Sequence, residues 1–350
     1  MVRTVAIAVP GDLGSPTGGY AYDRRMIREL ERLGWQVEVV QLGDGFPFPT
    51  NEQKRNATMR LMEIPTGRPI VVDGLALGAI PEAAAQLCRR YPLIALVHHP
   101  LASETGLTAT RANELRASER AALAVARHVV VTSRATARLL VADYDVPTER
   151  VTVAHPGNDL VVPARGSSDG IVRLLSVGSI VPRKGFDVLI AALATFAEMP
   201  WHLTIAGDRG RDPAAVAQLD ADIARYRLSG KVVALGAVSS ERLTELYARA
   251  DLFVVASRFE GYGMAFSEAI AHGLPVVGTA IGALPDIIPA GAGVLVAPDD
   301  AAALATALRR LIDSATERCR MAGNARAAAQ ALPRWQDSAK LFAAAIESAL

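Results

Sequence analysis

The sequence contains few cysteines, few aromatic residues and no long apolar run. Its two cysteines, Cys88 and Cys319, do not form a metal-ligand motif and are expected to be reduced thiols of a cytoplasmic protein. Apolar residues reach 51% only because alanine is abundant, and no stretch approaches the roughly 18 apolar residues of a membrane-spanning helix. Residues 1–10 are interpreted as a first strand, because their apolar run is too short for a signal-peptide core.

An excess of charge of one sign is lacking too, since 37 lysines and arginines face 36 aspartates and glutamates. The balance gives no global attraction to nucleic acid, so no nucleic-acid partner is predicted. Locally, Lys54, Arg55 and Arg60 form a basic cluster before Leu61 and Met62, which suits a peripheral contact with the inner face of an anionic membrane. A charged, solvated helix face is the favoured interpretation of this cluster.

Twelve short runs of β-branched or aliphatic residues recur along the chain. Such continuous apolar runs are typical of strands buried on both faces of a parallel sheet. The predicted strands are residues 5–9, 37–42, 70–72, 94–97, 129–132 and 151–154, then 172–177, 203–206, 232–235, 252–256, 275–278 and 293–296. Helical patterns lie between them, among others at 22–33, 119–126, 186–196, 214–226 and 241–250.

The alternation of strand and helix predicts an α/β fold with two doubly wound parallel sheets. The break is placed at residues 163–170, a polar stretch of small residues without periodicity. The predicted domains are therefore residues 1–165 and 171–332, followed by a last helix within 335–350.

The most informative segment is residues 251–278, where an apolar strand ends at a polar turn and a Gly-x-Gly pair opens a helix. Free N–H groups and the positive dipole at a helix start suit a phosphate. Glu260 and Glu268 stand on either side of this anion site, and carboxylates accept hydrogen bonds from hydroxyls. The ligand is therefore predicted to carry phosphate and sugar together. A surface pair that decorates a helix is the alternative.

Two glycine-containing loops support a phosphate ligand. Arg183 and Lys184 precede a helix expected to begin near Phe186, and two cations beside a helix N-terminus suit a diphosphate. Gly18 and Gly19 at the start of another helix allow close approach of the backbone to a ligand. Their spacing is not the dinucleotide fingerprint, so a nicotinamide cofactor is disfavoured. Solvated basic residues and a mobile turn without ligand are the alternatives.

His98 and His99 follow the predicted strand 94–97, at the end of the sheet where α/β proteins place their ligands. A neutral imidazole there would hydrogen-bond a sugar or an acceptor hydroxyl, and Glu104 is assigned to the same site. A loop histidine satisfied by the backbone is the alternative for each.

No metal is predicted. Asp143 with Asp145, and Asp220 with Asp222, match an Asp-x-Asp pattern formally. The first pair precedes a Val-Pro loop, and the second lies within a helix, where positions i and i+2 do not face together. Both pairs are interpreted as solvated carboxylates.

Together these motifs resemble those of the retaining GT-B glycosyltransferases of family 4, over nearly the whole chain. The most specific element is the spacing of Glu260 and Glu268, followed by Gly273-Leu-Pro-Val-Val277. The supporting elements are the Gly18-Gly19 loop, Pro182-Arg-Lys-Gly185, Ile205-Ala-Gly-Asp208 and Val153-Ala-His-Pro-Gly-Asn-Asp159.

The resemblance implies two Rossmann-like domains facing a central cleft, the donor on the second and the acceptor mainly on the first, with the final helix packing back on the first domain. It implies that Glu268 holds a ribose and that Glu260 contacts the transferred sugar. Lys184, with the amides of Gly261, Tyr262, Gly263 and Met264, would neutralise the leaving diphosphate, and His98 or His99 would lie near the sugar. One departure is Ser179, where relatives often carry an arginine that helps to hold the diphosphate. Its task is expected to fall to Arg183 and Lys184, or to be filled by a residue from elsewhere in the chain.

The predicted function is transfer of a hexosyl unit from a nucleoside-diphosphate sugar to an acceptor hydroxyl, with retention of configuration and without metal or other cofactor. The alternatives are a non-catalytic sensor of sugar nucleotides and a sugar-nucleotide epimerase on a similar scaffold. The nucleotide base, the sugar and the acceptor stay open.

Overall fold

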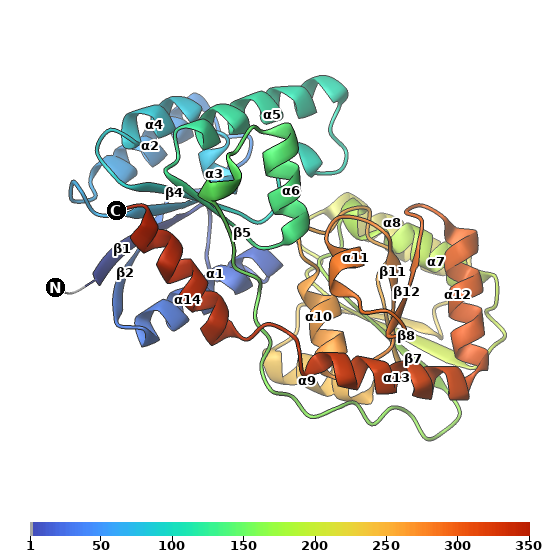
Figure 1. Ribbon diagram of the computed structural model, residues 1–350. Helices are drawn as coiled ribbons and strands as arrows, with labels where there is room; N and C mark the ends of the chain where they lie inside the picture. The colour runs from blue at the N-terminus through green and yellow to red at the C-terminus, as the bar shows by residue number, and fades with distance from the viewer. Residues whose placement is uncertain (1–2) are drawn as a thin grey trace. The chain divides into compact units, whose positions relative to one another are not determined.

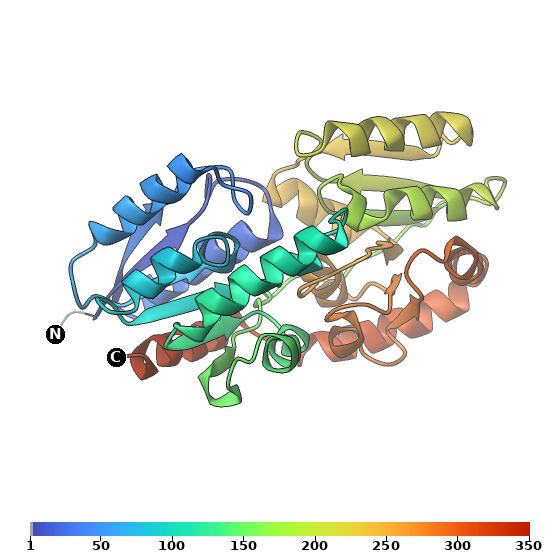
Figure 2. The same ribbon diagram turned by 90° about the horizontal axis from the view of Figure 1, so that it is seen from above.

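Each half of the chain forms its own six-stranded parallel sheet flanked by helices (Figures 1 and 2). The computed structural model describes residues 3–350, which divide into two units. The first unit runs to Gly157 and includes Pro333–Leu350, and the second unit is Asn158–Leu332. Two doubly wound parallel sheets were the predicted fold class, and this prediction is confirmed.

The first unit has the strand order β2-β1-β3-β4-β5-β6. Its order reverses between β1 and β3, and ligands of doubly wound sheets bind at the carboxyl ends of strands at such a reversal. The strands are β1 (Arg3–Val9), β2 (Trp35–Gln41), β3 (Ile70–Asp73), β4 (Leu93–Val97), β5 (His128–Val131) and β6 (Val151–Val153). The helices are α1 (Gly18–Arg32), α2 (Asn51–Met62), α3 (Gly74–Leu77), α4 (Pro81–Leu87), α5 (Ala109–Ala124), α6 (Arg134–Asp143) and α14 (Trp335–Ser348).

The second unit repeats this plan with the order β12-β11-β10-β7-β8-β9, which reverses between β7 and β10. The strands are β7 (Val172–Val177), β8 (Trp201–Ala206), β9 (Val232–Gly236), β10 (Leu252–Val254), β11 (Val276–Thr279) and β12 (Gly293–Val296). The helices are α7 (Phe186–Ala194), α8 (Pro213–Arg225), α9 (Ser240–Arg249), α10 (Met264–Ala271), α11 (Leu284–Ile287), α12 (Ala301–Asp313) and α13 (Ala315–Ala329).

Each predicted strand is present, with bounds that differ by two residues or fewer. The expectation that all are buried on both faces is wrong for strands at the sheet edges. Val39 in β2 is 39% exposed, and Val233 and Leu235 in β9 are 52% and 41% exposed. An edge strand has a neighbour on one side only, so flanking helices cover it less completely.

The helix predicted at 119–126 begins ten residues earlier, at Ala109. Thr108 starts it, because its side chain accepts a hydrogen bond from the N–H of Arg111 at 3.2 Å, which satisfies one donor of the first turn. The first turns are mostly exposed, so they lack the apolar periodicity on which the prediction rested.

The two units separate earlier than the stretch 163–170 that composition suggested. Part of that stretch is tied to the second unit by its backbone: Ala164 N–H donates to the carbonyl of His272 at 2.7 Å, and Arg165 N–H to that of Ala248 at 3.0 Å. The composition of a segment can indicate a loop, but it does not reveal the backbone hydrogen bonds that attach the loop to one unit.

The last helix, α14, lies beside α1 within the first unit (Figure 1). The rings of Tyr22 and Trp335 are 5.9 Å apart, and a Cβ on Gly157 would lie 2.2 Å from the backbone nitrogen of Trp335. Glycine at 157 therefore allows the close approach of the two segments. Across residues 3–350, no helix combines the length and apolarity that crossing a bilayer requires.

Candidate functional site

The strongest site in the second unit lies where its strand order reverses, on the loops after β7 and β10. Lys184 follows β7 and Glu260 follows β10, and Lys184 Nζ lies 2.6 Å from Glu260 Oε1. Arg183 Nη1 lies 3.9 Å from Glu260 Oε2. The predicted cations and the first predicted carboxylate are thus brought together, although they are 76 residues apart in sequence.

Glu260 is buried, with 5% of its surface exposed, and the Ser257 hydroxyl donates to its Oε1 at 2.6 Å. Burial alone would raise the pKa of this carboxyl group. The charges of Lys184 and Arg183 outweigh burial and lower the pKa of Glu260 below its usual value. Glu260 is therefore an ionised hydrogen-bond acceptor at neutral pH.

The turn between Glu260 and α10 brings backbone N–H groups to a helix start without a side-chain cap. Gly263 has φ 98°, and a Cβ there would lie 2.6 Å from Leu284, so glycine is required on both grounds. Gly261 and Met264 border this turn, and the side chain of Tyr262 is buried at 7% exposure. Tyr262 therefore faces the protein with its ring, and only its backbone is left for the predicted anion contact.

Glu268 lies half-buried on α10 and accepts a hydrogen bond from the Tyr247 hydroxyl at 2.9 Å. Burial raises the pKa of Glu268 to about 7, against the hydrogen bond from Tyr247, and the negative charge of Asp159 adds to the rise. Tyr247 in turn stacks on His272 with ring centroids 5.0 Å apart. Sequence reasoning missed Tyr247, because no motif links it to α10.

The loop that carries Ser179 is held by its backbone. Ile180 N–H donates to the carbonyl of Asp208 at 2.9 Å, and a Cβ on Gly207 would lie 1.8 Å from the carbonyl oxygen of Gly178. These contacts explain the Ile205-Ala-Gly-Asp208 motif: glycine lets the loop after β8 press against the loop after β7. Arg258, a further arginine here, is bound to Asp187 and Asp299, each at 2.7 Å, so it braces the loop.

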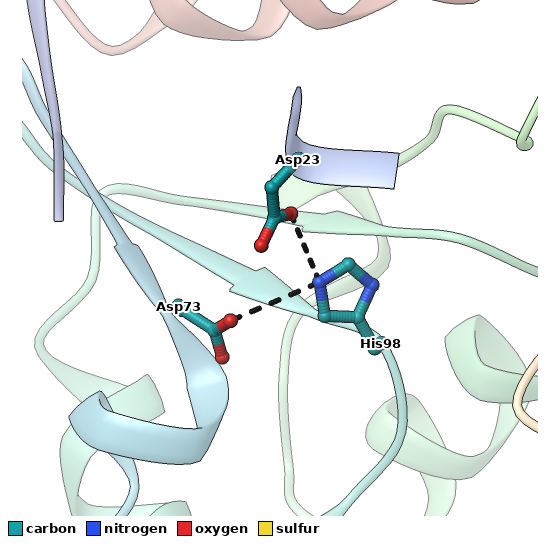
Figure 3. A group of neighbouring side chains, drawn as sticks. All are labelled: Asp23, Asp73 and His98. Carbon is teal, nitrogen blue, oxygen red and sulfur yellow. Dashed lines mark hydrogen bonds and ion pairs between the residues drawn. The ribbon is translucent and has the colours of Figure 1, made fainter. Parts of the chain in front are cut away.

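In the first unit, three side chains converge where the strand order reverses (Figure 3). His98 follows β4, Asp73 ends β3, and Asp23 lies on α1. His98 Nε2 is 3.1 Å from Asp23 Oδ1 and 3.9 Å from Asp73 Oδ2. A Cβ on Gly19 would lie 3.4 Å from the His98 ring, so Gly18 and Gly19 open α1 against this histidine. Neither aspartate belongs to a recognisable motif.

The two histidines have different environments. His99 Nε2 lies 2.7 Å from Glu104 Oε1, so Glu104 pairs with His99 and not with His98. The prediction that Glu104 belongs to one site with both histidines is thereby refined. His98 and His99 follow the strand one after the other, and their side chains contact different neighbours.

One expectation about carboxylates is wrong. Asp222 is buried at 7% exposure and accepts from the Gln218 amide at 3.0 Å, so it is not solvated; Asp145 is exposed and paired with Arg120. Asp23, Asp73 and His98 also place possible ligand atoms within 4.8 Å of one another, a spacing that a metal ion would accept. No sequence motif predicts this group.

The first unit also holds a cavity of about 220 Å³ at the carboxyl ends of β1 and β2. Asp12, Ser15, Tyr20 and Asp44 line it, and no lysine or arginine does. The basic residues Lys54, Arg55 and Arg60 lie on α2, and contact with a membrane there stays a prediction.

Comparison with known proteins identifies the class as glycosyltransferases. The model of the glycosyl transferases group 1 matches residues 163–328, and that of glycosyltransferase family 4 matches residues 67–162. The chain belongs to these family 4, group 1 glycosyltransferases, as its motifs predicted, and it is an enzyme of that class.

Its relatives differ in the compounds that their names state. The MMP alpha-(1->4)-mannosyltransferase of Mycolicibacterium hassiacum is 28% identical over 87% of this chain and 76% of its own. The D-inositol 3-phosphate glycosyltransferase of Nocardioides sp. is 34% identical over 58% of this chain and 50% of its own, so the match spans about half of that relative.

Solved structures agree on the fold. Sucrose-phosphate synthase from Thermosynechococcus elongatus gives a TM-score of 0.82 at 23% identity and covers 98% of this chain and 100% of its own. Anabaena HepE in complex with UDP-glucose gives 0.74 at 20% identity and covers 98% and 99%. Both likenesses bear out the GT-B fold.

The buried ion pair makes a prediction about stability. Replacing Lys184 with Met leaves the Glu260 carboxylate buried beside a weaker partner, so we expect the free energy of unfolding to fall by roughly 3 kcal/mol. Adding Glu260→Gln to Lys184→Met should recover part of the loss, because the stranded charge is gone. Urea denaturation of the single and double variants measures both effects.

Lys340→Met is the matched control, because Lys340 pairs with Asp337 at 2.9 Å on the exposed surface and its loss should cost less than about 1 kcal/mol. The lowered pKa of Glu260 means that the pair's contribution is present above the ordinary pKa of 4.5 and is lost as pH falls through the folded value below it. Equal losses for Lys184→Met and Lys340→Met would contradict the assignment.

Proposed function

We propose that the protein transfers a hexosyl unit from a nucleoside-diphosphate sugar to an acceptor hydroxyl, with retention of configuration and without a metal. The observation that carries the proposal is the Lys184–Glu260 pair at the strand reversal of the second unit, with Arg183 beside it. The pair places cations that suit a diphosphate beside an ionised carboxylate that accepts hydrogen bonds from sugar hydroxyls. The UDP and UDP-glucose named with the similar HepE structures support a nucleotide-sugar donor.

The charges suit the chemistry of this transfer. Breaking the bond from the anomeric carbon to the phosphate oxygen builds positive charge on the sugar and negative charge on the departing diphosphate. Lys184, Arg183 and the N–H groups at the start of α10 stabilise that negative charge, which is the task a metal would otherwise perform. The leaving phosphate takes the proton of the acceptor hydroxyl, whose oxygen bonds the anomeric carbon on the same face.

The two glutamates have separate tasks in this proposal. Glu260, fixed by Lys184 and Ser257, accepts hydrogen bonds from hydroxyls of the transferred sugar and orients it without attacking it. Glu268 accepts from the ribose hydroxyls, and Tyr247 sets the direction of its carboxylate.

Release of nucleoside diphosphate tests the proposed reaction. With a matching donor and acceptor, the wild type should release it at an undiminished rate in the presence of EDTA, and Glu260→Gln should lower kcat by roughly a hundredfold. The experiment screens UDP-, GDP- and ADP-sugars, with Glu245→Gln, a change on the exposed surface, as control.

The outcomes separate the alternatives. Binding of a sugar nucleotide without release would indicate a sensor, and an altered sugar that stays attached to its nucleotide would indicate an epimerase. Loss of activity with EDTA and its return with Mg²⁺ would refute the metal-free mechanism, and an α-to-β change at the anomeric carbon of the product would refute retention.

The raised pKa of Glu268 predicts how donor binding depends on pH. Because this pKa is about 7, the carboxylate form is lost as pH falls from 8 to 6, and with it the better acceptor for ribose hydroxyls. We expect the Kd for nucleoside diphosphate to rise below pH 7, by at most about tenfold per pH unit. Calorimetric titration measures this, and Glu268→Gln should bind weakly with no such dependence; a wild-type Kd that is flat between these pH values would contradict the ribose role.

We also propose that the acceptor binds in the cavity beside β1 and β2 and carries no phosphate. The lining of that cavity contains the carboxylates of Asp12 and Asp44, whereas the guanidinium of Arg24 nearby is held by the carbonyl of Ser15 at 3.0 Å. In matched pairs such as inositol and D-inositol 3-phosphate, the neutral compound should give a kcat/KM higher by roughly tenfold or more. The double variant Asp12→Asn with Asp44→Asn should narrow the difference in kcat/KM between the neutral and the phosphorylated compound. Asp143→Asn, a change on the exposed surface, should leave that difference unchanged. Preference of the wild type for the phosphorylated member would refute the proposal.

A further inference from the structure

Asp23, Asp73 and His98 form a polar cluster whose composition the proposed reaction does not explain. They come from three elements, α1, β3 and the segment after β4, and meet at the strand reversal of the first unit. Asp23 is 1% and Asp73 4% exposed. Two buried carboxylates this close repel each other and lose hydration, so the cluster is costly unless a cation compensates them.

His98 is the basic side chain that contacts both carboxylates among residues 3–350. Asp73 is held in place by its other oxygen, because Oδ1 accepts from the Leu75 N–H at 2.7 Å. Asp23 Oδ2 is buried without a hydrogen-bond partner in the described part of the chain, and Figure 3 shows this oxygen on the side toward Asp73. The hydrogen bonds in the cluster therefore do not compensate all of its negative charge. This favours a full positive charge on the His98 ring.

The geometry also distinguishes the two ring nitrogens. Both carboxylates approach Nε2, and carboxylate oxygens accept hydrogen bonds, so Nε2 carries a hydrogen. Figure 3 shows Nδ1 pointing away from both aspartates. Nδ1 is therefore the atom that meets a ligand: it would accept a hydrogen bond if the ring were neutral and donate one if the ring were charged.

We propose that Asp23 and Asp73 are positioning residues that hold His98 as an imidazolium, so that its Nδ1–H donates a hydrogen bond to a hydroxyl oxygen of the bound substrate. The identity of that substrate rests on the proposed function, whereas the state of the ring does not. The assignment replaces the neutral imidazole expected from the sequence with a charged one.

The titration behaviour of the cluster agrees with this geometry. Burial lowers the pKa of His98, but Asp23, with Asp73, raises it to about 9. The pKa of Asp73 is raised to about 7, first by burial and then by Asp23. The Tyr22 ring, which packs edge-on against the imidazole at 5.4 Å, is neutral, because its pKa is raised well above 10.0. The backbone of His98 is held by the Thr132 hydroxyl, which donates to the His98 carbonyl at 3.2 Å.

NMR of the full chain labelled with ¹⁵N-histidine tests the proposal without any substrate. The signal of His98 among the 6 histidines is assigned by its disappearance in His98→Gln. Near pH 7 both ring nitrogens should be protonated, and the midpoint of deprotonation should lie near 9. Asp23→Asn should lower that midpoint by roughly two pH units, and Asp73→Asn by less. Glu347→Gln, which breaks an exposed pair with Arg3 in the same unit, should leave it unchanged.

A second readout ties the ring to the reaction. Asp23→Asn should lower kcat near neutral pH by roughly tenfold, with little change in KM, and should move the alkaline fall of activity to lower pH. Asp23→Glu should restore part of both. A merely structural role for Asp23 would reduce the amount of folded protein and leave the pH profile of the remaining activity in place, and that result would overturn the proposal.

Two NMR results would also overturn it. One is a wild-type His98 that is neutral near pH 7 or whose midpoint does not respond to either aspartate. The other is loss of the Nε2 hydrogen on adding Zn²⁺ or Mn²⁺, reversed by EDTA, because a metal-bound nitrogen carries no proton and the cluster would then be a cation site. If Asp23→Asn does not fold, Asp73→Asn gives the same NMR test. Failure of nucleotide release would refute the proposed function and leave the NMR result valid.

Discussion

The ion pair between Lys184 and Glu260 is the interaction on which the site of the second unit depends. A carboxylate beside a diphosphate site would repel the ligand if its charge were uncompensated, and buried alone it would take up a proton. Lys184 prevents both, since it keeps Glu260 ionised while neutralising its charge. The same pair joins the loops after β7 and β10, the two strands between which the order reverses.

The backbone around the pair is built to make that contact. A Cβ on Gly185 would lie 2.0 Å from the carbonyl oxygen of Ala256, so the two loops meet at a distance that only glycine permits. Arg183 donates to the carbonyl of Phe259 at 3.0 Å, and Arg258 N–H donates to that of Arg183 at 2.7 Å. Arg183 is therefore held by main-chain hydrogen bonds as well as by charge. Mobile surface side chains would lack this preorganisation, which is what makes charge stabilisation effective.

The sequence allowed the strands and the second-unit site to be predicted because both leave local patterns. Buried parallel strands appear in the sequence as apolar runs, and the glycine turn appears as two glutamates at a fixed spacing. The missed features depend on contacts between distant positions. Asp23 lies 75 residues before His98, and Tyr247 lies 21 before Glu268, and a single aspartate or tyrosine carries no pattern of its own. The exposure of side chains in β2 and β9 was not predicted either, because it depends on the position of these strands at the edges of the sheets.

Both units place charged side chains where the strand order reverses, but the predominant charge has the opposite sign in each. At the strand reversal of the second unit, two cations exceed one carboxylate; at that of the first, two carboxylates exceed one imidazole. Under the proposed function, an anionic donor is therefore favoured by the second set of charges and disfavoured by the first, although the two sheets share a strand plan. The excess of carboxylates in the first unit is also the reason for the charge proposed on His98, because a neutral His98 ring would leave the negative charge of the two aspartates buried without compensation. Specificity in this fold thus comes from a few charged side chains placed at the reversal, and the sheets supply their position.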